Sequence, residues 1–279
     1  MGLVPLTWVT AMSSTLQQTR ANKVDQTLTA VPGNWKFNES VAEHFDSHVR
    51  KSIPLYDEVQ SLCVSIGEWF VAEDSLVYDL GCATGETLLT LAKKYAQTRR
   101  IRLVGFDESA AMLERAGEKL KGYPATLIEQ RVSGETRFPR ATFVAALYTL
   151  QFILLEERLQ ILSNIYSDLR TGGALFMVEK CLSERSEIQE IWSGLYYDFK
   201  TSQGFTTEEI IGKALSLRGV MAPITASENE RALRSAGFEV VDRVSQWGPF
   251  VAFLAIKGIR TNQDQAGSTD LQRSANARP

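Results

Sequence analysis

The feature that most constrains the fold is the short segment Leu76–Gly85 (LVYDLGCATG), in which an apolar run leads into an acid and a glycine turn. Such a run is typical of a strand buried in a parallel sheet. Gly81 and Gly85 permit a tight turn and a close approach of backbone to a ligand. The amphipathic stretch Glu86–Tyr95 follows directly. The segment therefore predicts a strand, a glycine turn and a helix, which is the first half of a nucleotide-binding βαβ unit.

The predicted turn lacks the features of a phosphate site. It has no GK[ST] ending, and Ala83 stands where the dinucleotide fingerprint has its second glycine. Asp79 at the strand end would repel a pyrophosphate but can accept hydrogen bonds from an ammonium group. This pattern favours a zwitterionic adenosyl ligand, and it resembles motif I of the class I S-adenosylmethionine (SAM) dependent methyltransferases. The alternative is a plain tight turn in another kind of α/β protein.

Strands and helices alternate after this segment. Helices are predicted over residues 86–95, 109–121 and 156–169, and Thr171-Gly172-Gly173 is expected to end the last of them. The pattern predicts an α/β fold, a class I methyltransferase-like (Rossmann-like), doubly wound and mostly parallel sheet of seven strands whose last strand is antiparallel. The predicted strands cover residues 76–80, 102–107, 126–131, 143–147, 174–179, 238–244 and 250–257.

The SAM-binding domain is predicted to cover residues 34–258. Its N-terminal part, 34–72, contains helices over 38–50 and 56–70 that we expect to lie across the ligand site as a lid. A helical insertion over 183–236 precedes the last two strands. Its helices are expected to begin at Ser186, at Thr206 with a capping box, and at Ser227. Residues 1–33 are predicted to be a flexible leader and 259–279 a disordered tail.

Composition argues against several classes of protein. The net charge of −3 gives no overall basic field, so direct nucleic-acid binding is not expected. The small basic cluster of Lys93, Lys94 and Arg99–Arg102 is interpreted as a solvated face in preference to an RNA contact. No apolar run reaches the length of about 18 residues that a membrane helix requires.

Cysteine and histidine usage indicates location and metal content. The three scattered cysteines are typical of a reducing cytoplasm. His44 and His48 are four residues apart, which suits a metal ligand pair, but no third ligand is evident, so structural or exposed histidines are the preferred interpretation. We therefore expect a cytoplasmic protein without a metal.

A second acid completes the predicted cofactor site. Asp107 ends the second strand, 26 residues after Gly81, where a carboxylate can accept both ribose hydroxyls. The alternative is a helix N-cap or a surface acid. Glu108 is a candidate for the adenine side, or else a solvated acid in the first turn of the next helix.

Short motifs occur in order along residues 35–257. They are Trp35–Phe37, Val41–Glu43, Ser52–Pro54 with Tyr56, Tyr78–Cys82, Tyr148–Phe152, Gly172–Leu175, Glu179-Lys180, Asp198–Lys200, Val220-Met221 and Ala236–Phe238. Together they resemble the family of carboxy-S-adenosyl-L-methionine (carboxy-SAM) synthases, which serve the wobble-uridine carboxymethoxy modification of tRNA. DLGC and AGF are generic to SAM enzymes, whereas SIPxY, TLQF and DFK are more specific.

The resemblance implies SAM as cofactor, prephenate as second substrate, a methyltransferase fold and a homodimer that places a neighbour's helix near the site. The cofactor-binding positions are then Tyr56, Asp79, Gly81, Cys82, Ala83, Gly85, Asp107, Glu108, Val132 and Leu147. Three family positions differ in this chain. Arg131 replaces an Asp, Leu147 replaces an Asn, and Ala214 replaces the Arg that grips the added carboxylate.

These differences leave three functional hypotheses. The leading one is a SAM-dependent methyltransferase acting on a small molecule, because a carboxylate formed in a dry pocket needs a cation and Ala214 supplies none. The alternatives are a carboxy-SAM synthase, with Lys213 or Arg218 as the replacement cation, and a non-catalytic SAM-binding subunit. Tyr56 and Asp198 are the catalytic candidates.

The remaining candidates are substrate contacts. Tyr148, Tyr197 and Arg218 are the substrate-binding candidates, and Tyr148, Tyr196 and Tyr197 are also possible bases. For each tyrosine the alternative is a half-buried packing residue with a hydrogen-bonded hydroxyl. For Asp198 the alternative is a surface ion pair with Lys200.

Overall fold

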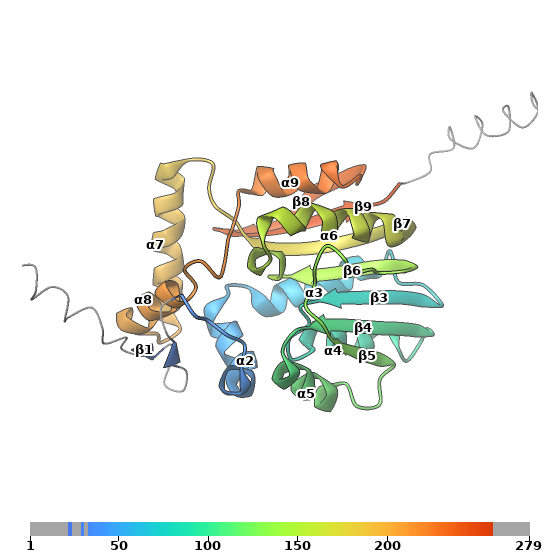
Figure 1. Ribbon diagram of the computed structural model, residues 1–279, viewed down its shortest axis with the longest axis horizontal. Coiled ribbons are helices and arrows are strands. Elements are labelled where there is room, and N and C mark those ends of the chain that lie inside the picture. The colour runs from blue at the N-terminus through green and yellow to red at the C-terminus, as the bar shows by residue number, and fades with distance from the viewer. Residues whose placement is uncertain (1–21, 24–28, 31–32, 259–279) are drawn as a thin grey trace, which may run out of the picture.

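The computed structural model describes residues 22–23, 29–30 and 33–258 (Figure 1). The expected tail, and the expected leader apart from a few residues, lie outside this range. The two-residue strands β1 (Asn22–Lys23) and β2 (Thr29–Ala30) pair with each other. The backbone N–H of Gly33 then donates to the carbonyl of Leu215 over 3.0 Å, so the start of the continuous chain is attached to the helical insertion.

A seven-stranded sheet forms the centre of the molecule, as the sequence predicts. Its strand order is β5-β4-β3-β6-β7-β9-β8, and all neighbours are parallel except for β9, which runs antiparallel to both β7 and β8. The chain order reverses between β3 and β6, which is where ligands bind in open α/β sheets. The strands are β3 (Ser75–Leu80), β4 (Ile101–Asp107), β5 (Ala125–Glu129), β6 (Ala141–Leu147), β7 (Leu169–Lys180), β8 (Val240–Trp247) and β9 (Phe250–Ile256).

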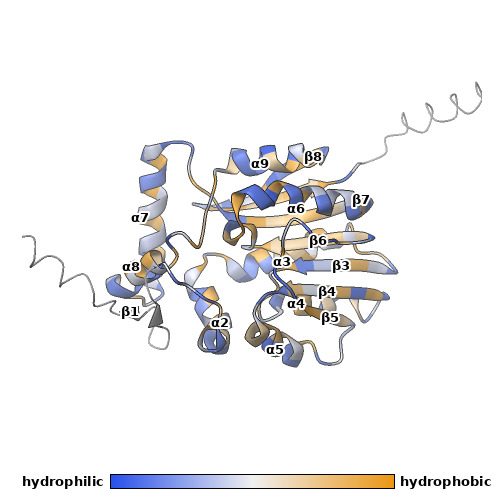
Figure 2. Cartoon of the chain, viewed as in Figure 1, coloured by the Kyte–Doolittle hydropathy of each residue, from blue (hydrophilic) through white to orange (hydrophobic). Residues whose placement is uncertain are grey.

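Helices cover both faces of this sheet. Strand residues alternate between the two faces, so Tyr78 and Leu80 pack toward α6 and α9, whereas Val77 packs toward α3, α4 and α5. Figure 2 shows the strands as mostly apolar and the outer turns of the helices as hydrophilic. The helices are α2 (Glu39–Ser52), α3 (Tyr56–Gly67), α4 (Glu86–Tyr95), α5 (Ala110–Lys119), the short η1 (Leu150–Phe152), α6 (Leu155–Asp168), α7 (Ser186–Ser202), α8 (Thr207–Ser216) and α9 (Ala226–Ser235).

Some predicted helix boundaries are wrong. The helix α3 ends at Gly67, before the predicted end at residue 70. The helix α6 ends at Asp168, before the Thr171-Gly172-Gly173 segment, because Leu169 is already extended and pairs with Ala141 as the first residue of β7. The helix α9 is capped by Thr225, not by Ser227. Thr225 and Glu228 form a reciprocal capping box, the same arrangement that Thr206 and Glu209 form at α8, where the prediction is confirmed.

The helical insertion stands beyond the carboxyl ends of the central strands. In Figure 1 the arrowheads of β3 and β6 point toward the side of the molecule where α7 and α8 lie, with α2 beside them. Among the described residues, no helix is long and apolar enough to cross a bilayer. The fold thus gathers strand ends, the two N-terminal helices and the insertion around one region of the molecule.

Candidate functional site

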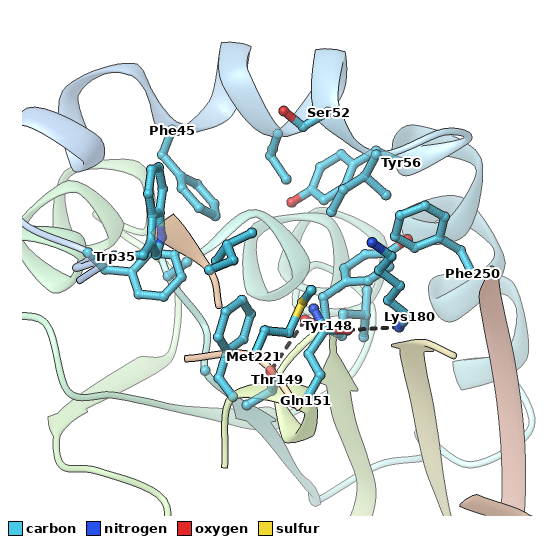
Figure 3. Close-up of a pocket in the computed structure, with 18 of the residues that line it drawn as sticks. Trp35, Phe45, Ser52, Tyr56, Tyr148, Thr149, Gln151, Lys180, Met221 and Phe250 are labelled. Atoms are coloured by element: carbon cyan, nitrogen blue, oxygen red, sulfur yellow. Dashed lines mark hydrogen bonds between the residues drawn. The ribbon is translucent and has the colours of Figure 1, made fainter. Parts of the chain in front are cut away.

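A cavity of about 500 Å³ lies at the carboxyl ends of the parallel strands. Residues that follow β3, β4, β5, β6 and β7 form its floor, α2 and α3 form one wall, and α7 and α8 form another. Figure 3 shows Tyr56 and Phe45 on the α2–α3 side, facing Tyr148 and Met221 across the cavity, with Lys180 and Phe250 at one end. This volume is in the range of small-molecule sites.

The glycine turn after β3 is held by close packing. Gly81 has φ +66°, and a Cβ there would lie 2.7 Å from both Oγ1 and Cγ2 of Thr149. Ala83 also adopts a left-handed conformation, with φ +46°. Thr149 Oγ1 donates to the carbonyl of Leu80 over 2.6 Å. The turn is therefore joined directly to the segment that follows β6, across the point where the strand order reverses.

Asp79 is a buried acid with an unused acceptor. Only 2% of its surface is exposed, and its Oδ2 has no hydrogen-bond partner among the described residues. Burial, and then the nearby charge of Asp107, raise the pKa of Asp79 well above its usual value. A buried carboxylate without a partner is costly, so this oxygen requires a donor or cation from a ligand. An ammonium group on a bound small molecule would meet that requirement.

Asp107 is oriented by backbone groups and still has acceptor capacity. Its Oδ2 accepts from Ala83 N and its Oδ1 from Ser109 N, both over 2.9 Å. Each oxygen retains a lone pair, which two vicinal hydroxyls could occupy. Burial raises the pKa of Asp107, and these two backbone hydrogen bonds oppose that rise. The N-cap of α5 is Ser109, whose Oγ accepts from Met112 N, so the alternative interpretation of Asp107 as that cap is wrong.

Four aromatic side chains line the cavity in sequence from α3 to α7. Tyr56 stacks on Tyr148 at 6.3 Å between ring centroids, Tyr148 meets the edge of Phe250 at 6.0 Å, and Phe250 contacts Tyr196 at 5.2 Å. Tyr148 has a left-handed backbone, with φ +60°, and its buried hydroxyl has no partner among the described residues. Strain of this kind concentrates at functional sites.

These tyrosines are poor bases. Burial is the largest effect on the pKa of Tyr56, Tyr148 and Tyr196, and it raises all three above the usual value for tyrosine. Each hydroxyl therefore stays neutral near pH 7 and acts as a donor, while the ring face offers a surface for a cation. Tyr56, the catalytic candidate from the sequence, lines the cavity with a neutral hydroxyl.

Two lysines reach the far end of the cavity. Lys180 ends β7 and Lys200 lies in the last turn of α7, and their Nζ atoms are 4.7 Å and 4.3 Å from the centroid of the Tyr196 ring. Lys200 is only 6% exposed. Burial, and then the charge of Lys180, lower the pKa of Lys200 to about 7, and burial also lowers the pKa of Lys180.

A third lysine lies beside His48. Lys213 of α8 contacts Nε2 of His48, and its Nζ is 4.4 Å from the centroid of the Trp35 ring. His48 is buried and also shares a hydrogen bond of 3.0 Å with Ser52 Oγ. Within the residues that the structure describes, no group of three His, Cys, Asp or Glu side chains is arranged to hold a metal ion.

The roof of the glycine turn is an ion-paired network. Asp46 of α2 accepts from Thr84 Oγ1 over 2.6 Å and pairs with Lys119 over 2.5 Å. Arg50 of α2 pairs with Glu86 at the start of α4 over 3.1 Å. Helix α2 is thereby held over the turn and the first residues of α4.

Most of the predicted site residues line this one cavity, and two do not. The cavity lining includes the predicted Tyr56, Asp79, Gly81, Cys82, Ala83, Asp107, Glu108, Val132, Leu147, Tyr148, Tyr197 and Arg218. Gly85 lies outside it, packed against α5, where a Cβ would lie 3.0 Å from that of Ala116. Asp198 is exposed on the opposite side of α7 from the residues that face the cavity.

Three residues that differ from the family pattern also lie at the cavity. Arg131 pairs with Glu157 over 2.6 Å, so its charge is matched by an acid. Leu147 and Ala214 contribute no charge to the lining. The replacement cations that the sequence suggests, Lys213 and Arg218, both line the cavity.

Sequence reasoning missed Lys180 and Lys200 as site residues. The suggested surface pair of Asp198 with Lys200 is wrong, because residues two apart point to opposite sides of a helix. The spacing of residues along α7 is a signal that could have identified Lys200. Gln189, Trp192, Ser193, Tyr196, Tyr197 and Lys200 recur every three or four residues, and all of them line the cavity.

Two arginines of the basic cluster are paired with nearby acids. Arg99 pairs with Glu68, and Arg100 pairs with Glu73 over 2.9 Å and with Asp74 over 3.0 Å. These exposed pairs lie near the amino end of β4, away from the residues that line the cavity.

Comparisons with known proteins agree with this architecture. Residues 77–173 match a family model described as a methyltransferase domain. A solved O-methyltransferase family protein from Burkholderia thailandensis has a similar fold, with a TM-score of 0.56 at 12% identity over 80% of this chain and 61% of its own. A carboxy-S-adenosyl-L-methionine synthase from Staphylococcus epidermidis is 36% identical over 81% of this chain and 98% of its own length.

A second relative with the same name, from Desulfotalea psychrophila, is also 36% identical, over 80% of this chain and 92% of its own. These matches span almost the whole length of the relatives, and the strand order, the glycine turn and the acid that ends β4 are those expected of the class. The chain therefore belongs to the carboxy-S-adenosyl-L-methionine synthase family, within the class I methyltransferase fold.

Proposed function

We propose that this protein is a SAM-dependent transferase that forms carboxy-SAM, the product named in its relatives. The observation that supports SAM most directly is the unpartnered Oδ2 of the buried Asp79 beside the Gly81 turn. The ammonium group of SAM would satisfy that oxygen. The ribose hydroxyls would donate to the remaining lone pairs of Asp107. In other nucleotide-binding turns, contacts to phosphate groups hold the ligand instead.

The residues of the cavity would orient the bound reactants and exclude water from them. SAM, when bound, would supply a methyl group that its sulfonium centre makes acidic. For carboxy-SAM formation this group would stay on sulfur, and a carboxyl group from the second substrate would replace one of its hydrogens, which leaves as a proton. The ring faces of Tyr56 and Tyr148 would stabilise positive charge at that centre. Asp79 and Asp107 fix the nucleoside from below, and the Asp46–Thr84 hydrogen bond holds α2 above the same turn as a lid. Alignment of the reacting groups then provides much of the acceleration.

Ordinary methyl transfer is the second candidate function. It is supported by Ala214, which lies at the cavity where the family pattern has a carboxylate-binding Arg. A methyltransferase would align a neutral or nucleophilic acceptor in the same space and would not need a cation at that position. A catalytically inactive SAM-binding subunit would bind SAM without converting it.

One experiment separates these functions. The protein is incubated with SAM alone, with SAM and prephenate, and with a panel of small acceptors, and the nucleoside products are weighed by mass spectrometry. The proposal expects carboxy-SAM only when prephenate is present. Formation of S-adenosylhomocysteine with an acceptor, and no carboxy-SAM, would favour methyl transfer. Bound but unchanged SAM in every mixture would favour the inactive subunit.

We also propose a cytoplasmic homodimer. The three cysteines are free and buried, which suits a reducing compartment. On α7, Ile188, Ile191 and Leu195 are exposed at helical spacing, and such an apolar stripe suits contact with a second copy of the chain. Sedimentation of the pure protein gives the oligomeric state, and a monomer at micromolar concentration would contradict this assignment.

A further inference from the structure

We propose that Lys180, Lys200 and Tyr196 form a carboxylate-binding subsite for the second substrate, an organic anion with an apolar body. The term second substrate rests on the proposed function. The subsite itself rests on the geometry of these three residues, which belong to β7 and α7. They meet at the β7 end of the cavity, and β6 separates β7 from β3, the strand that leads into the glycine turn.

The ammonium groups of Lys180 and Lys200 have no carboxylate partner among the described residues. Each lies over the Tyr196 ring and forms no ion pair there, although Lys200 is only 6% exposed. Arg131, which also lines the cavity, differs because it pairs with Glu157. A buried positive charge is costly unless something compensates it, and a negative ligand group beside the Tyr196 ring would compensate both ammonium groups.

Contacts within the chain fix the side chains of this subsite before any ligand binds. The Tyr196 hydroxyl donates to the carbonyl of Ser52 over 2.9 Å, which fixes the ring from the α2 side. Its ring packs at 71° against Phe250, with 5.2 Å between centroids. Both ammonium groups lie against this fixed ring. Lys180 is also held at its backbone, where its N–H donates to Gln151 Oε1 over 2.8 Å (Figure 3).

The chemistry of these side chains suits a carboxylate. Two ammonium groups are point charges that suit carboxylate oxygens, and Tyr148, which lines the same cavity, has a buried hydroxyl without a partner among the described residues. Phe250 touches the rings of both Tyr148 and Tyr196, so the surroundings of these donors are aromatic. This combination favours a carboxylate attached to an unsaturated or aromatic body over a small hydrated anion.

The two ends of the cavity consequently carry residues of opposite charge. Asp79 and Asp107 make the β3–β4 end acidic, whereas Lys180 and Lys200 make the β7–α7 end basic. A cationic nucleoside at the acidic end and an organic anion at the basic end would complement both. The lysines thus provide positive charge in the cavity although Ala214 does not.

The test measures binding of anionic probes by calorimetry. The probes are benzylsuccinate, with two carboxylates, phenylacetate, with one, and phenylacetamide, which is neutral and similar in shape. The wild-type protein should bind them in that order of affinity. Lys180→Met and Lys200→Met should each lower the affinity for benzylsuccinate about tenfold, which is the effect of one charge-assisted contact. Lys94→Met, an exposed lysine on α4, is the matched control and should leave affinity unchanged.

Three results would overturn the subsite. They are equal binding of phenylacetamide and benzylsuccinate, unchanged affinity in both lysine variants, and no binding of any carboxylate up to about 10 mM. Titration with S-adenosylhomocysteine is run on the same samples. The affinity for this nucleoside should remain within threefold of wild type in both variants. If that nucleoside fails to bind wild type while the carboxylates behave as expected, the proposed function fails and the subsite stands.

Discussion

The hydroxyl of Thr149 occupies the space that a side chain on Gly81 would need, 2.7 Å from the Cβ position. Thr149 follows β6 and Gly81 follows β3, so this contact joins the two strands at the point where the sheet reverses its order. The glycine is therefore required by packing as well as by its left-handed backbone.

Gly81→Ala should abolish nucleoside binding. The new methyl group would displace Thr149 and break its hydrogen bond to Leu80. Binding of S-adenosylhomocysteine should fall at least 100-fold, or roughly 3 kcal/mol. Gly122→Ala is the matched control, because Gly122 has φ +89° and no atom within 4 Å of its Cβ position. It should lose about 1 kcal/mol of stability and keep its affinity. Equal losses of affinity in both variants would show that packing against Thr149 is not the cause.

Lys200→Met should stabilise the protein. Burial lowers the pKa of Lys200 to about 7 from an unfolded value of 10.5, so the folded state holds the proton less tightly than the unfolded state does. The resulting loss of stability grows as the pH falls from 10.5 to 7 and is complete below 7. Methionine removes this penalty, and a gain of roughly 1–3 kcal/mol near pH 7 is expected in thermal unfolding.

The gain in the Lys200→Met variant should shrink as the pH approaches 10. The exposed control Lys94→Met should change stability by less than about 0.5 kcal/mol at any pH. A destabilised Lys200→Met protein at pH 7 would mean that this ammonium group is compensated within the chain itself.

Carboxylate affinity should depend on pH through the same lysine. An anion prefers the charged form of Lys200, so affinity is greatest below pH 7 and declines as the pH rises through 7. Benzylsuccinate should bind about tenfold more weakly at pH 8 than at pH 6. Tyr196 and Tyr148 stay neutral in this range because burial raises the pKa of each. Lys200→Met should remove most of the dependence, and a pH profile that is unchanged in this variant would assign the effect to another group.

The sequence predicted the sheet well because its signals are local. The apolar run into Asp79 and the amphipathic period of Glu86–Tyr95 each specify an element from adjacent residues, and the structure places α4 over that same range. Prediction was weaker where tertiary pairing decides. Leu169 reads as helical by continuity with α6, but hydrogen bonding to the neighbouring strand extends it.

The candidate site could be predicted only in part, for a similar reason. Asp79, Gly81 and Asp107 lie at strand ends, and parallel strands bring their carboxyl ends together. Lys180 and Lys200 belong to elements whose relative position depends on how α7 packs, which no short segment encodes. Asp198 was chosen for its neighbours in the sequence, although its place on the helix turns it toward solvent.

The central claim is that Asp79 receives the ammonium group of a SAM-type nucleoside, and Asp79→Asn tests it most directly. This substitution keeps the size of the side chain and removes its charge. Calorimetry compares S-adenosylhomocysteine, which carries the ammonium group, with methylthioadenosine, which lacks it. We predict that Asp79→Asn lowers the affinity for S-adenosylhomocysteine at least tenfold and leaves the affinity for methylthioadenosine within twofold of wild type. Equal affinity of wild type and variant for S-adenosylhomocysteine would contradict the account.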